Sequence, residues 1–141
     1  MTIKEIQDEI IDEFSMFDDW MQRYEYIIEL GKSLPLIKEE YKTDENLIKG
    51  CQSKVWLQGE QNDDKIVFTA DSDAILTKGI IAILIRAFSN QKASDIINAD
   101  TDFIDEIGLK EHLSATRANG LVSMIKNIKM YALAFDAKNK N

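Results

Sequence analysis

The chain has 141 residues, of which 45% are hydrophobic and 30% charged, and its formal net charge is −8. This length and composition are typical of one globular domain that buries a core without disulfides or structural metal. The acidic balance argues against nucleic-acid binding, which needs a basic surface. We also expect no signal peptide and no membrane helix, since the sequence lacks both a basic leader and an apolar run of ~20 residues.

The first part of the chain predicts two helices. Thr2 and Glu5 have the spacing of a capping box. Apolar residues then recur at helical spacing, namely Ile3, Ile6, Ile10, Phe14 and Phe17. Asp18 or Asp19 can cap a second helix, which is expected to end at Gly31.

A β region is expected next, after a polar loop over residues 38–46. Residues 54–59 alternate between apolar and polar side chains and predict a strand. Turn-forming residues at 61–64 separate this strand from a returning strand at 65–70. Residues 47–49 are expected to add a short third strand.

The second half of the chain is predicted to be helical. Ser72 or Asp73 can cap a helix that continues through Ser89. This helix is apolar on nearly every side, so it should be the most buried helix. Shorter helices are expected over residues 94–98 and 102–107.

The last expected helix runs from about residue 116 to residue 135. A basic C-terminal turn should complement the helix dipole and solubilise the tail, and its lysines are Lys126, Lys129, Lys138 and Lys140. The predicted fold class is α+β, with a small antiparallel sheet of about three strands packed against N- and C-terminal helices. We expect a single domain over residues 1–141.

Cys51 is the only cysteine, and it lies between a flexible Gly50 and the start of a predicted strand. A lone thiol can form neither an internal disulfide nor a multi-cysteine metal site, but it can act as a nucleophile or carry a group. The alternative is an inert core residue, since free cysteines are often buried. A cysteine hydrolase would need a base. His112 is the only histidine, and nothing in the sequence places it beside Cys51.

Other site chemistries lack the residues they require. Structural zinc takes four ligands, normally cysteine and histidine, so we expect no metal. The aspartates within residues 63–73 lack the alternating pattern of a calcium loop, and a turn with a helix cap explains them. Residues 114–121 are unusual, because Arg117 lies where the helix dipole prefers acids and Gly120 lowers helix stability. Such inconsistency can mark a functional site, or a surface turn with a closely packed glycine.

Five blocks of the sequence, in order from about residue 20 to residue 129, resemble the SufE family of sulfur-acceptor proteins. The blocks are residues 26–35, 48–56, 71–75, 78–82 and 112–121. The chain departs from the family only in ordinary substitutions, such as those around Arg117. The SufE fold resembles that of IscU-type scaffolds. Those scaffolds hold a cluster with several cysteines, so the single thiol favours a carrier.

The resemblance implies a persulfide carrier rather than an independent enzyme. SufE-like proteins work with a pyridoxal-phosphate cysteine desulfurase, here of the SufS-like or CsdA-like kind, which holds sulfur as a persulfide. Cys51 would accept this sulfur, activate the desulfurase and pass the sulfur to a scaffold complex that assembles iron–sulfur clusters. The carrier would need no cofactor of its own and would work in the cytoplasm. A weak homodimer stays open, and so does a non-catalytic adaptor role.

The same resemblance implies the roles of individual residues. Cys51 is the expected persulfide acceptor. Supporting or partner-binding roles are expected for Gly50, Gln52, Asp71, Asp73, His112 and Arg117. Ile48, Val55 and Trp56 are expected to shelter the sulfur from oxidation, while Gly50 lets the loop swing toward the partner.

Overall fold

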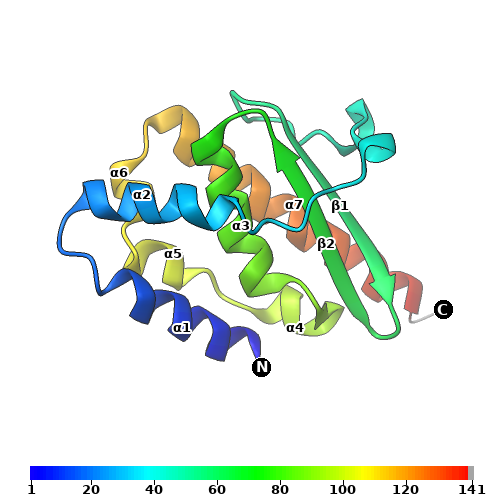
Figure 1. Ribbon diagram of the computed structural model, residues 1–141. Coiled ribbons are helices and arrows are strands. Elements are labelled where there is room, and N and C mark those ends of the chain that lie inside the picture. The colour runs from blue at the N-terminus through cyan, green and yellow to red at the C-terminus, as the bar shows by residue number, and fades with distance from the viewer. Residues whose placement is uncertain (140–141) are drawn as a thin grey trace.

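The computed structural model describes residues 1–139 (Figure 1). It opens with α1 (Ile3–Phe14) and α2 (Trp20–Gly31), as predicted. The capping box of α1 is confirmed, because Glu5 N–H donates to Thr2 Oγ1 at 3.1 Å and Thr2 N–H donates to Glu5 Oε1 at 2.9 Å. Of the two candidate caps, Asp19 begins α2 by accepting a backbone hydrogen bond at 2.8 Å.

Two long strands, β1 (Val55–Asn62) and β2 (Lys65–Ser72), form an antiparallel hairpin. Side chains from both strands alternate into the core, and the buried ones are Val55, Leu57, Ile66, Phe68 and Ala70. The predicted third strand at residues 47–49 is wrong, since this segment forms only one isolated bridge, from Leu47 to Trp56. The third strand is β3 (Gln91–Lys92), which pairs with β2.

The helix α3 (Ile75–Phe88) is almost wholly buried, as predicted from its apolar surface. The prediction that Ser72 or Asp73 caps it is wrong, because its first flanking residue is Ala74, which makes no side-chain cap. The Asp73 carboxylate instead accepts a hydrogen bond from Lys54 N–H at 3.0 Å. This aspartate therefore fastens the loop before β1 rather than the helix after β2.

The remaining helices follow the order predicted from the sequence, with additional short turns. They are the 3-10 turns η1 (Glu39–Tyr41) and η2 (Asp44–Asn46), and the α-helices α4 (Ala93–Asn98), α5 (Asp102–Glu106), α6 (Leu109–His112) and α7 (Ala115–Asn139). The turns η1 and η2 lie within the expected polar loop, and α6 was not predicted. Lys140 of the basic C-terminal turn lies outside the described residues. Among residues 1–139, no helix is long and apolar enough to cross a bilayer.

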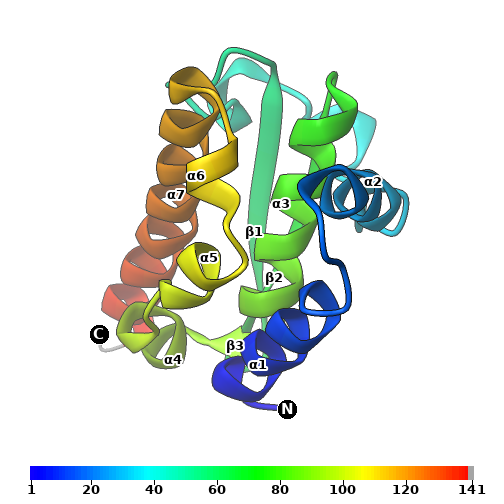
Figure 2. The same cartoon turned by 90° about the vertical axis from the view of Figure 1, so that its left-hand side faces the viewer.

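The hairpin runs along one side of the molecule, with α3 and α7 beside it and α1, α2, α5 and α6 farther from the sheet (Figures 1 and 2). The loop that leads from η2 into β1 lies at the end of the molecule where α3 and α7 begin. Figure 2 shows the start of α1 and the end of α7 at the opposite end, near α4. The fold therefore brings the loop that carries Cys51 to the first turns of two long helices.

Candidate functional site around Cys51

The loop that carries Cys51 is anchored at its base. Ile48 N–H donates to the Val55 carbonyl at 2.8 Å, so the two ends of the loop are held together. The Asp73 carboxylate adds the hydrogen bond to Lys54 N–H at 3.0 Å. Cys51 thus projects from a short segment with fixed ends, and any motion of the thiol must occur between residues 48 and 55.

Gly50 is required by the geometry of this loop. Its φ is +93°, in a region that favours glycine. A Cβ atom built on Gly50 would lie 2.6 Å from Ser123 Oγ of α7. The glycine therefore lets the loop pack directly on α7 just before Cys51. Free swinging of this loop remains a prediction.

The Cys51 side chain is half-buried against α7. The thiol donates a weak hydrogen bond to the Gly120 carbonyl, with 3.7 Å between sulfur and oxygen. A small hollow of about 10 Å³ adjoins the thiol, about the least volume that can hold one water-sized group. Besides Cys51, it is lined by Gln52, Ser53, Thr77, Ile80, Thr116, Arg117, Gly120 and Met124.

The missing side chain of Gly120 makes room for the thiol. A Cβ atom at this position would lie 3.3 Å from Cys51 Sγ, which is tighter than most real contacts of this kind. The glycine in the first part of α7, which looked out of place in a helix, is thus explained by the close approach of the thiol. Arg117 lies one turn earlier and lines the same hollow.

Burial controls the reactivity of the thiol. It raises the pKa of Cys51 above the ordinary value, because the charged thiolate loses solvation. The hydrogen bond to the Gly120 carbonyl also requires the protonated thiol, since a carbonyl only accepts. At neutral pH the group is therefore a thiol in this position, and a more solvated position would make it a better nucleophile.

The structure brings Gly50, Gln52 and Arg117 to Cys51 but places Asp71 in a separate ion-pair cluster. The Asp71 carboxylate is 2.7 Å from Lys42 Nζ and 3.3 Å from Lys78 Nζ. Burial alone would raise the pKa of Asp71, yet the hydrogen bonds from Lys42, the Ser72 backbone and Lys78 outweigh burial and lower it. The Asp71 carboxylate thus joins the end of β2 to α3 and to the segment before η2.

His112 is also engaged away from the thiol. Its ring stacks on Trp20 with 4.1 Å between centroids, and its Nδ1 lies 3.0 Å from the Gly108 carbonyl oxygen. It does not line the hollow around Cys51. The structure therefore gives a cysteine hydrolase no histidine base at the thiol. Within residues 1–139, no group of three or more His, Cys, Asp or Glu side chains is placed to hold a metal ion.

The residues that shelter the thiol differ from those expected. Ile48 and Val55 are buried at 5% and 0% exposure, but neither lines the hollow, and Trp56 lies under the Lys42 ammonium, 5.5 Å from the ring centroid. The apolar part of the lining comes from Ile80 of α3 and Met124 of α7. The sequence neighbours of Cys51 could not indicate Ile80 or Met124, whereas Arg117 and Gly120 already looked unusual in the sequence.

Comparison with known proteins agrees with this geometry. A protein-family model described as SufE, Fe-S metabolism associated domain, matches residues 8–132. The chain belongs to the SufE family. The match covers α2, the Cys51 loop, the hairpin, α3 and most of α7, so every element of the site lies within the SufE domain. The protein is therefore a SufE-family protein of iron–sulfur metabolism.

Relatives of this SufE-family chain support the same assignment. It is 47% identical over 130 residues to an uncharacterized SufE-like protein of Rhizobium meliloti, covering 89% of this chain and 93% of the relative. It is 45% identical over 127 residues to a second such protein, from Rhizobium etli, covering 86% of each chain. The solution structure of a hypothetical protein from Thermus thermophilus shares the fold, with a TM-score of 0.76, 13% identity, and coverage of 92% of this chain and 94% of that one.

Proposed function

We propose that this SufE-family chain accepts sulfur on Cys51 as a persulfide from a pyridoxal-phosphate cysteine desulfurase of the SufS-like or CsdA-like kind. It thereby activates the desulfurase and passes the sulfur to a scaffold complex that assembles iron–sulfur clusters. The observation that carries the proposal is the position of the only thiol, half-buried in a small hollow at an anchored loop. The chain acts as a carrier rather than an independent enzyme, as one domain over residues 1–141, in the cytoplasm.

The proposed transfer is balanced without an added oxidant or reductant. The Cys51 thiolate attacks the outer sulfur of the persulfide on the desulfurase cysteine. The sulfur–sulfur bond of that persulfide breaks, a new one forms on Cys51, and the desulfurase cysteine leaves as a thiolate that takes up a proton. This transfer uses one sulfur atom on the carrier, so the single thiol of Cys51 is sufficient to accept and hold the transferred sulfur.

Shelter and reactivity place opposite demands on Cys51. A persulfide in water is readily oxidised or reduced, so a half-buried position protects the loaded carrier. The same burial raises the pKa of the thiol and lowers its reactivity at rest. We expect the segment between residues 48 and 55 to open on the desulfurase, so that the thiol ionises there and returns to the hollow once loaded.

Replacement of the thiol tests the proposal. Cys51→Ser should keep the fold, measured by circular dichroism and thermal unfolding, because the change is small and lies on a loop. It should abolish both the stimulation of a cysteine desulfurase and the gain of one sulfur atom in the intact-protein mass. Ser53→Ala, a change in the same hollow, is the matched control and should still be loaded. Full stimulation by Cys51→Ser would reject the carrier and favour the adaptor.

A further inference from the structure

Most basic side chains of this acidic protein are already bonded within the chain. Those in ion pairs with Asp or Glu are Lys4, Lys32, Lys42, Lys78, Arg86, Lys92 and Lys110. Arg23 and Lys129 donate to backbone carbonyls instead. Seven basic side chains in the described part of the chain have neither an ion pair nor a side-chain hydrogen bond, namely Lys38, Lys49, Lys54, Lys65, Arg117, Lys126 and Lys138.

Three of these seven groups lie in the Cys51 loop or line its hollow, and a fourth lies on α7 in a groove beside the loop. Lys49 and Lys54 lie within three residues of it in the loop, and Arg117 lines its hollow. Lys126 lies two turns further along α7 and lines a separate groove together with Lys49. A net charge of −8 would repel an acidic protein from most of the surface, so this basic edge favours its approach at the thiol.

The groove has a volume of about 380 Å³ and runs between the segment before Cys51 and α7. Lys49 and Lys126 supply its positive charge, and Glu45 is the acid in its lining. Leu47 and Met130 supply apolar surface, and the Met130 side chain is 56% exposed. Ser123 lines the groove and is also the residue on which Gly50 packs. The groove and the Cys51 loop therefore share one wall.

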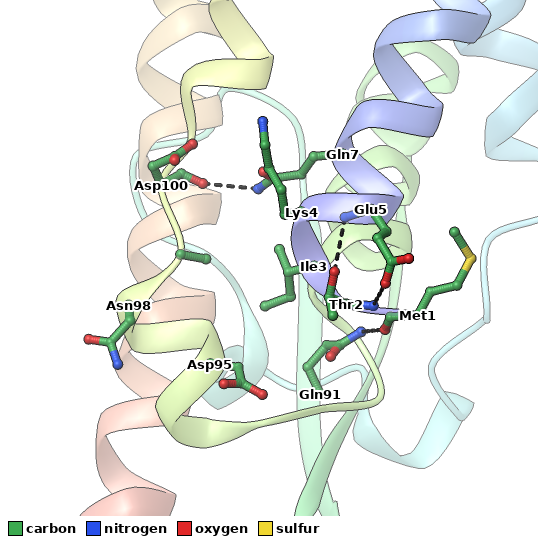
Figure 3. Close-up of a pocket in the computed structure, with 11 residues that line it drawn as sticks. Met1, Thr2, Ile3, Lys4, Glu5, Gln7, Gln91, Asp95, Asn98 and Asp100 are labelled. Carbon is green, nitrogen blue, oxygen red and sulfur yellow. Dashed lines mark hydrogen bonds between the residues drawn. The ribbon is translucent and has the colours of Figure 1, made fainter.

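A second, larger hollow differs from this groove in the charge of its lining. It measures about 590 Å³ and lies between the start of α1 and α4 (Figure 3). Its two glutamine side chains are bonded within the chain, since Gln7 Nε2 donates to the Asp100 carbonyl at 3.0 Å and Gln91 Nε2 donates to the Met1 carbonyl at 3.1 Å. Lys4 at its edge is paired with Asp8 at 3.0 Å. Lys4 is the only Lys or Arg side chain in the lining of that hollow, and it is already paired.

We propose that the groove of Lys49 and Lys126 receives an acidic segment of the desulfurase that loads Cys51, with one apolar side chain of that segment against Leu47 and Met130. This inference rests on the proposed function and adds the chemistry of the docking surface. Two lysines flanking an apolar floor complement a carboxylate beside a hydrophobic residue, and a volume of about 380 Å³ suits a short segment. Because the groove shares Ser123 with the Gly50 contact, its occupation bears directly on the position of the Cys51 loop.

Charge reversal in the groove tests the inference. The probe is a purified cysteine desulfurase that the wild-type chain stimulates, and the readout is the carrier concentration for half-maximal stimulation. Lys49→Glu and Lys126→Glu should raise this concentration roughly tenfold at low salt, with maximal stimulation unchanged. Lys138→Glu, an unpaired lysine near the far end of the same helix, is the matched control and should behave as wild type. Added salt should raise the carrier concentration that the wild-type chain needs for half-maximal stimulation, and bring it toward the values of the two groove variants.

Four outcomes would overturn the inference. Lys126→Glu and Lys49→Glu could match Lys138→Glu, in which case the groove does not dock the desulfurase. The groove variants could instead change only the self-association of the chain in sedimentation, which would assign the groove to a second copy. A wild-type chain that stimulates no cysteine desulfurase would reject the proposed function and this inference with it. Loading of Cys51 by a small persulfide donor should be equal in all variants, so slower loading in a groove variant would show altered thiol chemistry instead of lost docking and reject the inference.

Discussion

Two of the close contacts that glycines make in this molecule differ in the kind of atom that the glycine meets. Where α2 crosses α3, a Cβ atom on Gly79 would lie 2.1 Å from the Ile27 carbonyl oxygen, and one on Gly31 would lie 3.0 Å from Gly79 N. Beside the thiol, a Cβ atom on Gly120 would lie 3.3 Å from Cys51 Sγ. The first contact is between backbones of two packed helices, and the second involves a side chain on a loop.

The difference separates a structural contact from a functional one. Backbone atoms in packed helices cannot move aside, so the crossing of α2 and α3 accepts no extra atom without moving a whole helix. A thiol on a loop can shift by tenths of an ångström. We therefore expect changes at the helix crossing to reduce stability, and changes beside Cys51 to alter reactivity at nearly constant stability.

The largest expected effect is at the helix crossing. Gly79→Ala should lower the free energy of unfolding by about 3 kcal/mol or more, because the new methyl group overlaps the Ile27 carbonyl. Urea denaturation followed by circular dichroism measures the loss. Gly120→Ala is the control, since it makes the same substitution in another helix. Equal stability of the two variants would contradict the distinction between the contacts.

The next effect concerns the polar contact of α3 with α1. Arg86 donates to Glu13 at 2.7 Å and to Glu9 at 2.6 Å. Arg86→Met should lower the free energy of unfolding by about 2 kcal/mol near neutral pH, because half-buried Glu13 loses its charged partner. Lys32→Met, which removes only an exposed pair with Glu29, should cost almost nothing.

The pH dependence of this effect follows from Glu13. The hydrogen bond from Arg86 holds the pKa of Glu13 below its ordinary value of about 4.3. The stabilisation is therefore present above the unfolded-state pKa and lost as the pH falls through the lowered folded-state pKa. The stability difference between wild type and Arg86→Met should shrink across this acidic range. A difference that stays constant with pH would show that Arg86 acts through packing alone.

A smaller effect is expected beside the thiol. In Gly120→Ala, crowding of Cys51 should lower the free energy of unfolding by about 1 kcal/mol, while the higher helix propensity of alanine should raise it by about the same amount. Stability should therefore change little, whereas alkylation of Cys51 by a small reagent should become roughly fivefold faster as the loop opens. Alkylation with iodoacetamide followed by mass measurement gives the rate. An unchanged rate would show that Gly120 does not hold the thiol in place.

The smallest expected effect is a shift of the Cys51 titration midpoint to higher pH. Burial raises the pKa of Cys51, so the midpoint of alkylation rate against pH should lie above the ordinary value of about 8.5 in the native protein. The same protein unfolded in urea supplies the reference midpoint. The midpoint of Gly120→Ala should lie between those of the native and the unfolded wild-type chain. Coincident midpoints in the native and unfolded chain would contradict the sheltered position.

Local patterns were sufficient to predict most of the fold. The capping box at Thr2 and Glu5, the Asp19 cap and the apolar surface of α3 each depend on residues close together in the sequence, and all three are confirmed. The third strand could not be predicted, because β3 has two residues and shows no alternation. Residues 47–49 looked like a strand, but their backbone pairs only once with β1.

The candidate site was predictable only in part, since its hollow is built by tertiary packing. The lone thiol and the misplaced Gly120 were visible in the sequence, and the structure brings them into contact. Thr77, Ile80 and Met124 were missed because each looks like an ordinary residue of an apolar helix. Asp73 was expected to cap a helix, and its bond to Lys54 depends on two segments that meet only in the fold.

The backbone bridge between Leu47 and Trp56 places an indole at the base of the Cys51 loop. The chain has two tryptophans, and the other, Trp20, stacks on His112. A Trp20→Phe variant therefore retains Trp56 as its single tryptophan, with the Lys42 ammonium 5.5 Å from the ring centroid, and this indole can be excited apart from the four tyrosines. Emission from Trp56 makes the opening and closing of the loop an optical signal that can be followed in stopped flow without any attached dye.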